Sequence, residues 1–187
     1  MVRIPSRHAP VLLALLLVAL PACRSTPPRV SAPAVRAVVP AAPATEQARL
    51  VSELNQKLSA YPEASATPFG SNAVLLTVPS HVLFRFDSQA LSADGVGVVA
   101  ALGEGLKGRG GASCEVSVYT DVIGGASDNT TLARHRSEGL VAQLVADGVA
   151  SPRLQANGAG PTKPLVANDT PEGRRQNRRV TFLIKLG

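Results

Sequence analysis

The sequence is poor in aromatic residues, because its 187 positions hold no tryptophan, two tyrosines and four phenylalanines. Proteins that bind single-stranded nucleic acid stack the bases on aromatic side chains, and the basic run at residues 174–179 contains none. The formal net charge of +6 is also mild for such a role. We therefore expect no nucleic acid partner, and we expect a hydrophobic core built from aliphatic side chains.

Cysteine and histidine are also scarce. The two cysteines, Cys23 and Cys114, do not have the spacing of a zinc or redox site. None of the three histidines lies in a motif that pairs a nucleophile with a base, and the sequence has no phosphate-binding loop. The sequence therefore predicts no catalytic residue, no metal site and no cofactor. Cys114 is expected to act as a small apolar residue within a strand.

The amino terminus has the composition of a secretory signal. Arg3 and Arg7 precede an apolar run at residues 11–20, which is too short to span a bilayer. Small residues follow the run, as they do before a signal peptidase site. We predict a signal peptide over residues 1–22, which places the mature protein outside the cytoplasm.

Residues 20–23, Leu-Pro-Ala-Cys, resemble a bacterial lipobox. The resemblance implies that Cys23 becomes the acylated first residue of the mature chain, and several acyl chains would anchor it stably to a membrane. Arg24 stands where an aspartate would retain a lipoprotein in the inner membrane, which implies the outer membrane. Pro21 is a less usual residue in a lipobox, so secretion without lipidation is the alternative.

Two segments lead from the anchor to the folded part of the chain. Residues 23–44 are rich in proline and alanine, a composition typical of an extended or disordered spacer. Residues 45–60 carry leucines at helical spacing and predict a short helix, either docked or transient. Residues 61–72 are expected to form a loop.

The remaining residues, 73–187, alternate strand and helix patterns. Alternation of this kind predicts an α/β (α+β) fold with one mixed sheet and helices packed on one side. The expected strands cover residues 73–78, 81–86, 114–119, 153–157 and 180–186. The expected helices begin at Ser92, at Asp128 or Asn129, and at Thr170 followed by Pro171.

A candidate binding site lies in the stretch from residue 120 to residue 136. Asp121 follows an expected strand and Arg136 lies two turns inside the next expected helix, so a strand–loop–helix reversal can bring the two side chains together. If both charges are accessible, the carboxylate suits an ammonium group and the guanidinium suits a carboxylate. The pair therefore fits a zwitterionic ligand. The alternative is an ordinary ion pair that braces the strand against the helix.

Several motifs follow one another in a fixed order along this part of the chain. They are Thr120-Asp121 with Gly124, then Asn129, Leu132 and Arg136, then 158–160, and finally the stretch 168–180, which contains Asn-Arg-Arg-Val. With these motifs the chain resembles the OmpA-like peptidoglycan-binding domain over residues 73–187. The resemblance implies a βαβαβ-type mixed sheet and non-covalent binding of the diaminopimelate residue of peptidoglycan. It also implies that Asp121 accepts the ligand's ammonium and that Arg136 pairs with its carboxylate.

Other site residues follow from the same resemblance. Asn129 falls on a position that shapes the pocket, although a helix-capping role is an alternative for it. Arg178 falls on a position that adds positive charge beside the ligand. The segment Phe86, Asp87 and Ser88 falls on the loop that lines the other wall. The chain departs from the family pattern at Tyr119, Ala133 and Arg85.

These expectations combine into one functional hypothesis. The chain is predicted to be an outer-membrane lipoprotein whose periplasmic domain binds peptidoglycan and ties the membrane to the cell wall, in the layout of peptidoglycan-associated lipoproteins. The alternative is an envelope interaction protein, in which the same domain mainly docks a Tol-type or secretion-system protein.

Overall fold

The computed structural model describes residues 45–86 and 88–187. The predicted signal peptide at residues 1–22, the predicted acylation site Cys23 and the spacer that follows it lie outside the described residues, and so does Asp87. Among the residues that are described, no helix is long and apolar enough to cross a membrane.

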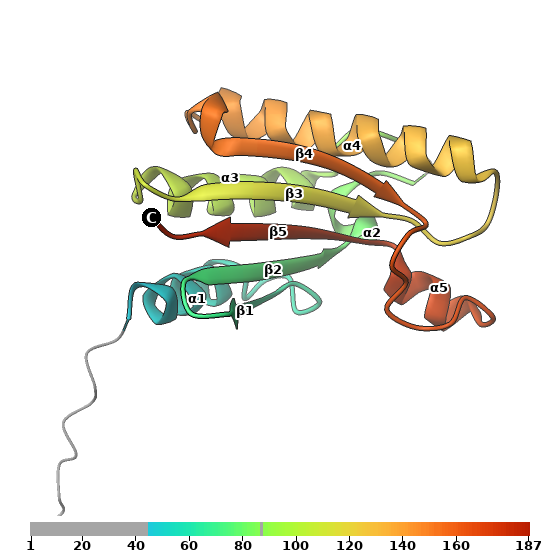
Figure 1. Cartoon of the computed structure of the whole chain (residues 1–187), viewed down its shortest axis with the longest axis horizontal. Helices are drawn as coiled ribbons and strands as arrows, with labels where there is room; N and C mark the ends of the chain where they lie inside the picture. The colour runs from blue at the N-terminus through green and yellow to red at the C-terminus, as the bar shows by residue number, and fades with distance from the viewer. Residues whose placement is uncertain (1–44, 87) are drawn as a thin grey trace, which may run out of the picture. The chain divides into compact units, whose positions relative to one another are not determined.

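A five-stranded sheet organises the described chain, with the strand order β1-β2-β5-β3-β4 (Figure 1). Strands β3 and β4 run parallel, and the other neighbours are antiparallel. The predicted mixed sheet is therefore confirmed. The strands are β1 (Ser65–Phe69), β2 (Ala73–Pro79), β3 (Ser113–Tyr119), β4 (Leu154–Gly160) and β5 (Arg179–Lys185).

Helices α1, α3 and α4 cover one face of this sheet (Figure 1). The short helix α5 lies beyond the end of the sheet, next to the start of β5. No helix of residues 45–86 or 88–187 covers the other face. The helical segments are α1 (Glu46–Lys57), α2 (Ser80–Leu83), α3 (Ala93–Lys107), α4 (Ala126–Ala146), the single turn η1 (Ser151–Arg153) and α5 (Pro171–Asn177).

The core between sheet and helices is aliphatic, as predicted. In β5 the alternate residues Val180, Phe182 and Ile184 are fully buried, as expected for the strand predicted over residues 180–186. Phe182 and Phe84 are the two aromatic side chains among the described buried hydrophobic residues. Cys114 is buried too, and burial together with the nearby charge of Glu115 raises the pKa of its thiol to about 12. A thiol with that pKa is unreactive at neutral pH.

The prediction of a strand over residues 81–86 is wrong. The chain instead forms the helical turn α2, which is closed by a hydrogen bond from Phe84 N to Ser80 O at 2.9 Å. Leu83 and Phe84 are neighbours and both are buried, whereas Phe86 is fully exposed, so the side chains do not alternate as in a strand. The turn carries Phe84 into the core at the end of the sheet.

The prediction of a loop over residues 61–72 missed β1. This strand contains Pro68, which cannot donate to a sheet ladder, and it lies at the sheet edge where that is tolerated. The side-chain amide of Asn55 in α1 exchanges two hydrogen bonds of 2.9 Å with the main chain of Ala66. Pairing with β2 and with α1 therefore forms a strand that its own sequence does not indicate.

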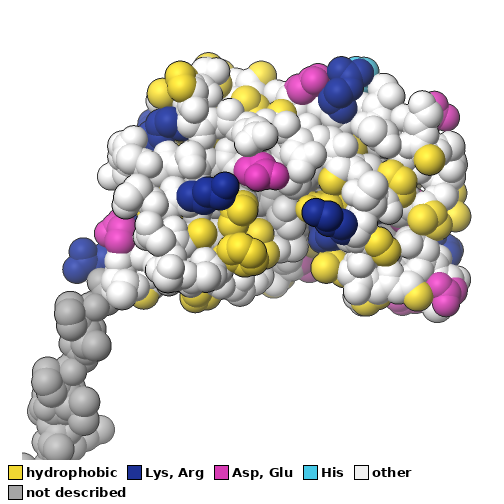
Figure 2. Space-filling model, in the orientation of Figure 1, with side chains coloured by type: hydrophobic (Ala, Val, Ile, Leu, Met, Phe, Trp, Pro, Cys, Tyr) yellow, Lys and Arg dark blue, Asp and Glu magenta, His cyan; other side chains and the backbone are white. Residues whose placement is uncertain are grey.

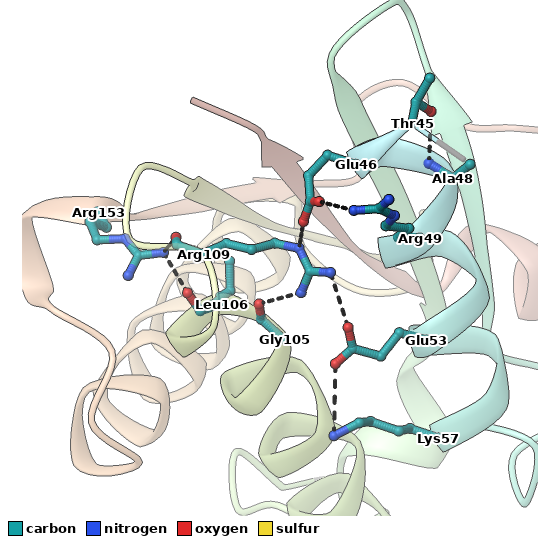
Figure 3. A network of polar contacts seen from close by, with 10 residues as sticks. All are labelled: Thr45, Glu46, Ala48, Arg49, Glu53, Lys57, Gly105, Leu106, Arg109 and Arg153. Atoms are coloured by element: carbon teal, nitrogen blue, oxygen red, sulfur yellow. Dashed lines mark hydrogen bonds and ion pairs between the residues drawn. The ribbon is translucent and has the colours of Figure 1, made fainter. Parts of the chain in front are cut away.

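The predicted helix at residues 45–60 is confirmed, and it is docked. Leu50, Leu54 and Leu58 are buried in the shared core. Figure 3 shows the polar contacts that fasten α1 to the end of α3. Arg109 donates from Nε to Glu46 at 2.6 Å and from an η nitrogen to Glu53 at 3.0 Å.

We expect Arg109→Ala to lower the free energy of unfolding by about 1–2 kcal/mol, because the guanidinium is mostly buried and bonded to two carboxylates. The matched control is Arg49→Ala, since Arg49 makes a long, exposed contact of 3.9 Å with Glu46. The control should change stability by less than about 0.5 kcal/mol. Urea denaturation measures both, and equal effects would mean that the Arg109 contacts do not hold α1.

The predicted caps of two helices are confirmed. The hydroxyl of Ser92 accepts from Gly95 N at the start of α3, and that of Thr170 accepts from Gly173 N at the start of α5. The predicted cap of α4 at Asp128 or Asn129 is wrong, because the helix begins earlier, after Gly125. On its inner face Ala133 and Ser137 are buried with Leu140 and Leu144, whereas Val145 is exposed.

Candidate functional site

The strand register brings Asp121 and Arg178 to the same end of the sheet. Val118 of β3 lies opposite Val180 of β5 in an antiparallel pair. Asp121 follows β3 and Arg178 precedes β5, so the two side chains lie side by side although they are far apart in the sequence. One η nitrogen of Arg178 donates to Asp121 Oδ2 at 2.5 Å.

The carboxylate of Asp121 is more enclosed than the sequence suggested. The residue is 7% exposed, and its second oxygen accepts a hydrogen bond of 3.0 Å from the main-chain N–H of Ile123. The condition that both charges are accessible is therefore not met by Asp121 in this structure. The cause is Arg178, which covers the carboxylate while its own side chain remains about half exposed.

Arg136 projects from α4 toward the segment that follows α2. Its Nε and one η nitrogen donate to the main-chain oxygen of Ser88 at 3.1 and 2.7 Å. The guanidinium also lies over the ring of Phe84, 4.6 Å from its centroid. These contacts fix the direction of the guanidinium, so it is a preorganised cation.

A cavity of about 340 Å³ opens beside these groups. Three of its lining side chains are arginines, so the cavity carries positive charge. Ser80, which lines the wall, has a buried hydroxyl oxygen without a hydrogen-bond partner in the described part of the chain. Among residues 45–86 and 88–187 this oxygen is the one buried side-chain polar atom in this condition. The lining residues are Ser80, His81, Phe84, Arg85, Phe86, Leu132, Arg136 and Arg178.

The other predicted site residues differ in how they relate to this cavity. Phe86 lines it with a fully exposed ring, while Ser88 contributes its main-chain oxygen to Arg136. Asn129 donates from its side chain to Ile123 O at 2.9 Å, so it holds the loop after β3 rather than capping α4. The predicted site residue Asp87 lies outside the described residues.

The predicted site did not include four of the lining residues: Ser80, His81, Phe84 and Leu132, although Leu132 belongs to the motif that contains Asn129 and Arg136. Phe84 lies in the segment predicted as a strand, and its contact with Arg136 depends on the turn α2. No cluster of three or more histidine, cysteine or acidic side chains that could hold a metal occurs in residues 45–86 and 88–187.

The mixed sheet and the arginine-lined cavity at its end define a binding domain of the α/β class. The sequence profile of the OmpA family matches residues 83–178, which is half of the chain. The chain therefore belongs to the OmpA family, and the resemblance predicted from its motifs is confirmed.

Two curated relatives share this part of the sequence. The Escherichia coli (strain K12) protein named "Probable lipoprotein YiaD" is 34% identical over 120 residues, which make up 64% of this chain and 54% of the relative. The peptidoglycan-binding protein ArfA of Mycobacterium tuberculosis is 31% identical over 103 residues, 55% of this chain and 32% of the relative. The chain thus spans about half or less of the length of these relatives.

A solved structure of a protein described as MotB-like, from Desulfovibrio vulgaris, has the same fold. It superposes with a TM-score of 0.67 at 25% sequence identity, covering 75% of this chain and 94% of that one.

Proposed function

We propose that this domain binds peptidoglycan non-covalently and recognises the diaminopimelate residue of the stem peptide. The observation that carries the proposal is the arginine-lined cavity, in which Arg136 is held in a fixed direction beside the Asp121–Arg178 pair. A ligand that carries both a carboxylate and an ammonium group complements these charges. The name of the relative ArfA, a peptidoglycan-binding protein, supports the same substrate class.

The geometry suggests how the ligand enters. The carboxylate of diaminopimelate would pair with Arg136, whose planar fork suits it. The ammonium would approach Asp121, which requires Arg178 to swing aside. Arg178 is about half exposed, so it can move, and it would then add its charge beside the ligand's carboxylate. Ser80 Oγ, which has no partner among the described residues, would gain one from a polar group of the ligand.

We also propose that the chain is an outer-membrane lipoprotein, acylated at Cys23, that holds this domain in the periplasm. The lipobox-like residues before Cys23 support this role, and so does the similarity to YiaD, which is named as a lipoprotein. In this arrangement residues 23–44 span the distance between membrane and cell wall, and binding alone, with no catalysed reaction, ties the two together.

Co-sedimentation separates this function from docking to another envelope protein, such as a Tol-type component. The purified protein is mixed with purified sacculi in one experiment and used to capture proteins from envelope lysate in another. We expect sedimentation with sacculi that free diaminopimelate inhibits. Capture of a protein partner without any sedimentation would contradict the proposal and favour the alternative.

A further inference from the structure

A second cavity, of about 450 Å³, is lined partly by α5 and shares no lining residue with the proposed diaminopimelate site. It opens on the sheet face that carries no helices. Figure 2 views that face and shows the surface hollowed between the sheet and α5, with basic and hydrophobic side chains at the hollow. The lining residues come from β2, α5, the start of β5 and two loops: Glu63, Thr77, Pro79, Leu165, Glu172, Arg175, Gln176 and Arg179.

The guanidinium of Arg179 forms part of the cavity wall, and its charge is not balanced by an acid. The residue is only 6% exposed and stacks on the ring of Tyr119, 3.8 Å from the centroid. Its η nitrogens donate to two main-chain oxygens, those of Asn177 at 3.3 Å and Lys163 at 3.1 Å. No carboxylate of residues 45–86 or 88–187 forms an ion pair with it.

Burial of such a cation is unfavourable, and burial lowers the pKa of Arg179. A guanidinium has five N–H donors, and two of them are used by the carbonyl oxygens. The remaining donors and the positive charge can take a carboxylate, whose two oxygens match the planar fork of an arginine.

The other charged residues of the cavity limit how much negative charge the ligand can carry. Glu63 is paired with Arg175, which lies 2.9 Å from each of its carboxylate oxygens. Glu172 has no such partner in the described part of the chain, so a ligand with several negative charges would be repelled. A ligand with a single carboxylate therefore matches Arg179, the one cation of this cavity without an ion pair among the described residues, whereas phosphate and polyanions carry too much negative charge beside Glu172.

The uncharged part of the wall is mixed, because Pro79 and Leu165 are apolar whereas Thr77 and Gln176 carry polar groups. Leu165 is 62% exposed at the mouth of the cavity, and Thr77 and Pro79 lie on the β2 side. An exposed leucine at the mouth favours a ligand with an aliphatic group next to its carboxylate, because contact with that group would remove apolar surface from water.

We propose that this cavity binds the C-terminal carboxylate of a short peptide, with the carboxylate on Arg179 and the aliphatic side chain of the last residue against Leu165. The proposal does not depend on the diaminopimelate site. The two cavities are lined by different arginines, so binding at one can be measured while the other is disabled.

The test follows the amide resonances of the full-length protein by NMR during titration with N-acetyl-alanyl-alanine, with its C-terminal amide and with inorganic phosphate. We expect shifts around Leu165 and Arg175 with the free acid alone. The affinity for the free acid should fall about tenfold or more in Leu165→Glu, which adds a negative charge at the cavity. It should fall by a similar factor in Arg179→Lys, which removes the planar guanidinium. Arg136→Glu should leave this affinity unchanged.

Equal binding of the acid and the amide would overturn the proposal, and so would binding of phosphate as tight as that of the acid. Leu165→Glu decides the matter if Arg179→Lys does not fold, because Leu165 is exposed and its replacement leaves the core intact. Undiminished binding of the acid in Leu165→Glu would exclude this cavity as the site.

Discussion

Replacing Arg136 by glutamate is expected to lower the affinity for peptidoglycan sacculi by about two orders of magnitude or more. Loss of one partner from a desolvated, hydrogen-bonded charge pair typically costs about 2–5 kcal/mol, and the new negative charge would also repel the ligand's carboxylate. The measurement is co-sedimentation over a range of sacculus concentrations. Arg136→Lys should give an intermediate loss, because it keeps the charge but not the planar fork.

The matched control is Arg134→Glu. Arg134 lies on the same helix two residues earlier, and its side chain is exposed beside Glu138. The change in net charge is identical in the two variants, so general electrostatic attraction to the cell wall changes equally. Equal loss of sedimentation in both variants would mean that net charge, and not the cavity, determines binding. The melting temperature of each variant shows whether it is folded.

The second large effect is expected for Gly158→Ala in β4. A Cβ atom at this position would lie 2.5 Å from the main-chain N and Cα of Arg134 in α4, which is far inside van der Waals contact. The helix would have to move away from the sheet, and we expect a loss of about 3 kcal/mol of stability. Because α4 carries Arg136, the displacement should also weaken binding to sacculi. Chemical denaturation and co-sedimentation measure the two effects.

Gly139→Ala in α4 is the control for this variant. A Cβ atom there meets nothing within 4 Å, and the position is inside the helix. Alanine should therefore stabilise the protein by about 0.5–1 kcal/mol through its better helix propensity. If the two glycine variants had the same stability, close packing between α4 and β4 would not be the reason for glycine at position 158.

The elements that the sequence predicted well are those whose signals are local. In β5 the alternation of Val180, Phe182 and Ile184 reports the buried face directly. Thr170 followed by proline marks the start of α5, since both the cap and the fixed proline backbone act within one turn. Strand β1 could not be predicted in this way, because partners in β2 and α1, and not its own residues, stabilise it.

The site was predictable in its residues but not in its contacts. Motifs identified Asp121, Arg136 and Arg178, yet nothing in the sequence indicates that Arg178 covers the carboxylate of Asp121. That contact follows from the register between β3 and β5, which joins residues 57 positions apart. The contact between Arg136 and Phe84 depends in turn on α2, which forms in place of the strand predicted over residues 81–86.

Calorimetric titration of residues 45–187 with diaminopimelate tests most directly whether the cavity beside Asp121 and Arg136 accepts a zwitterion. The predicted result is saturable heat for the wild type that disappears in Asp121→Ala and in Arg136→Glu and is unchanged in Arg134→Glu. The same heat in the wild type and in the two site variants would contradict the proposed binding site.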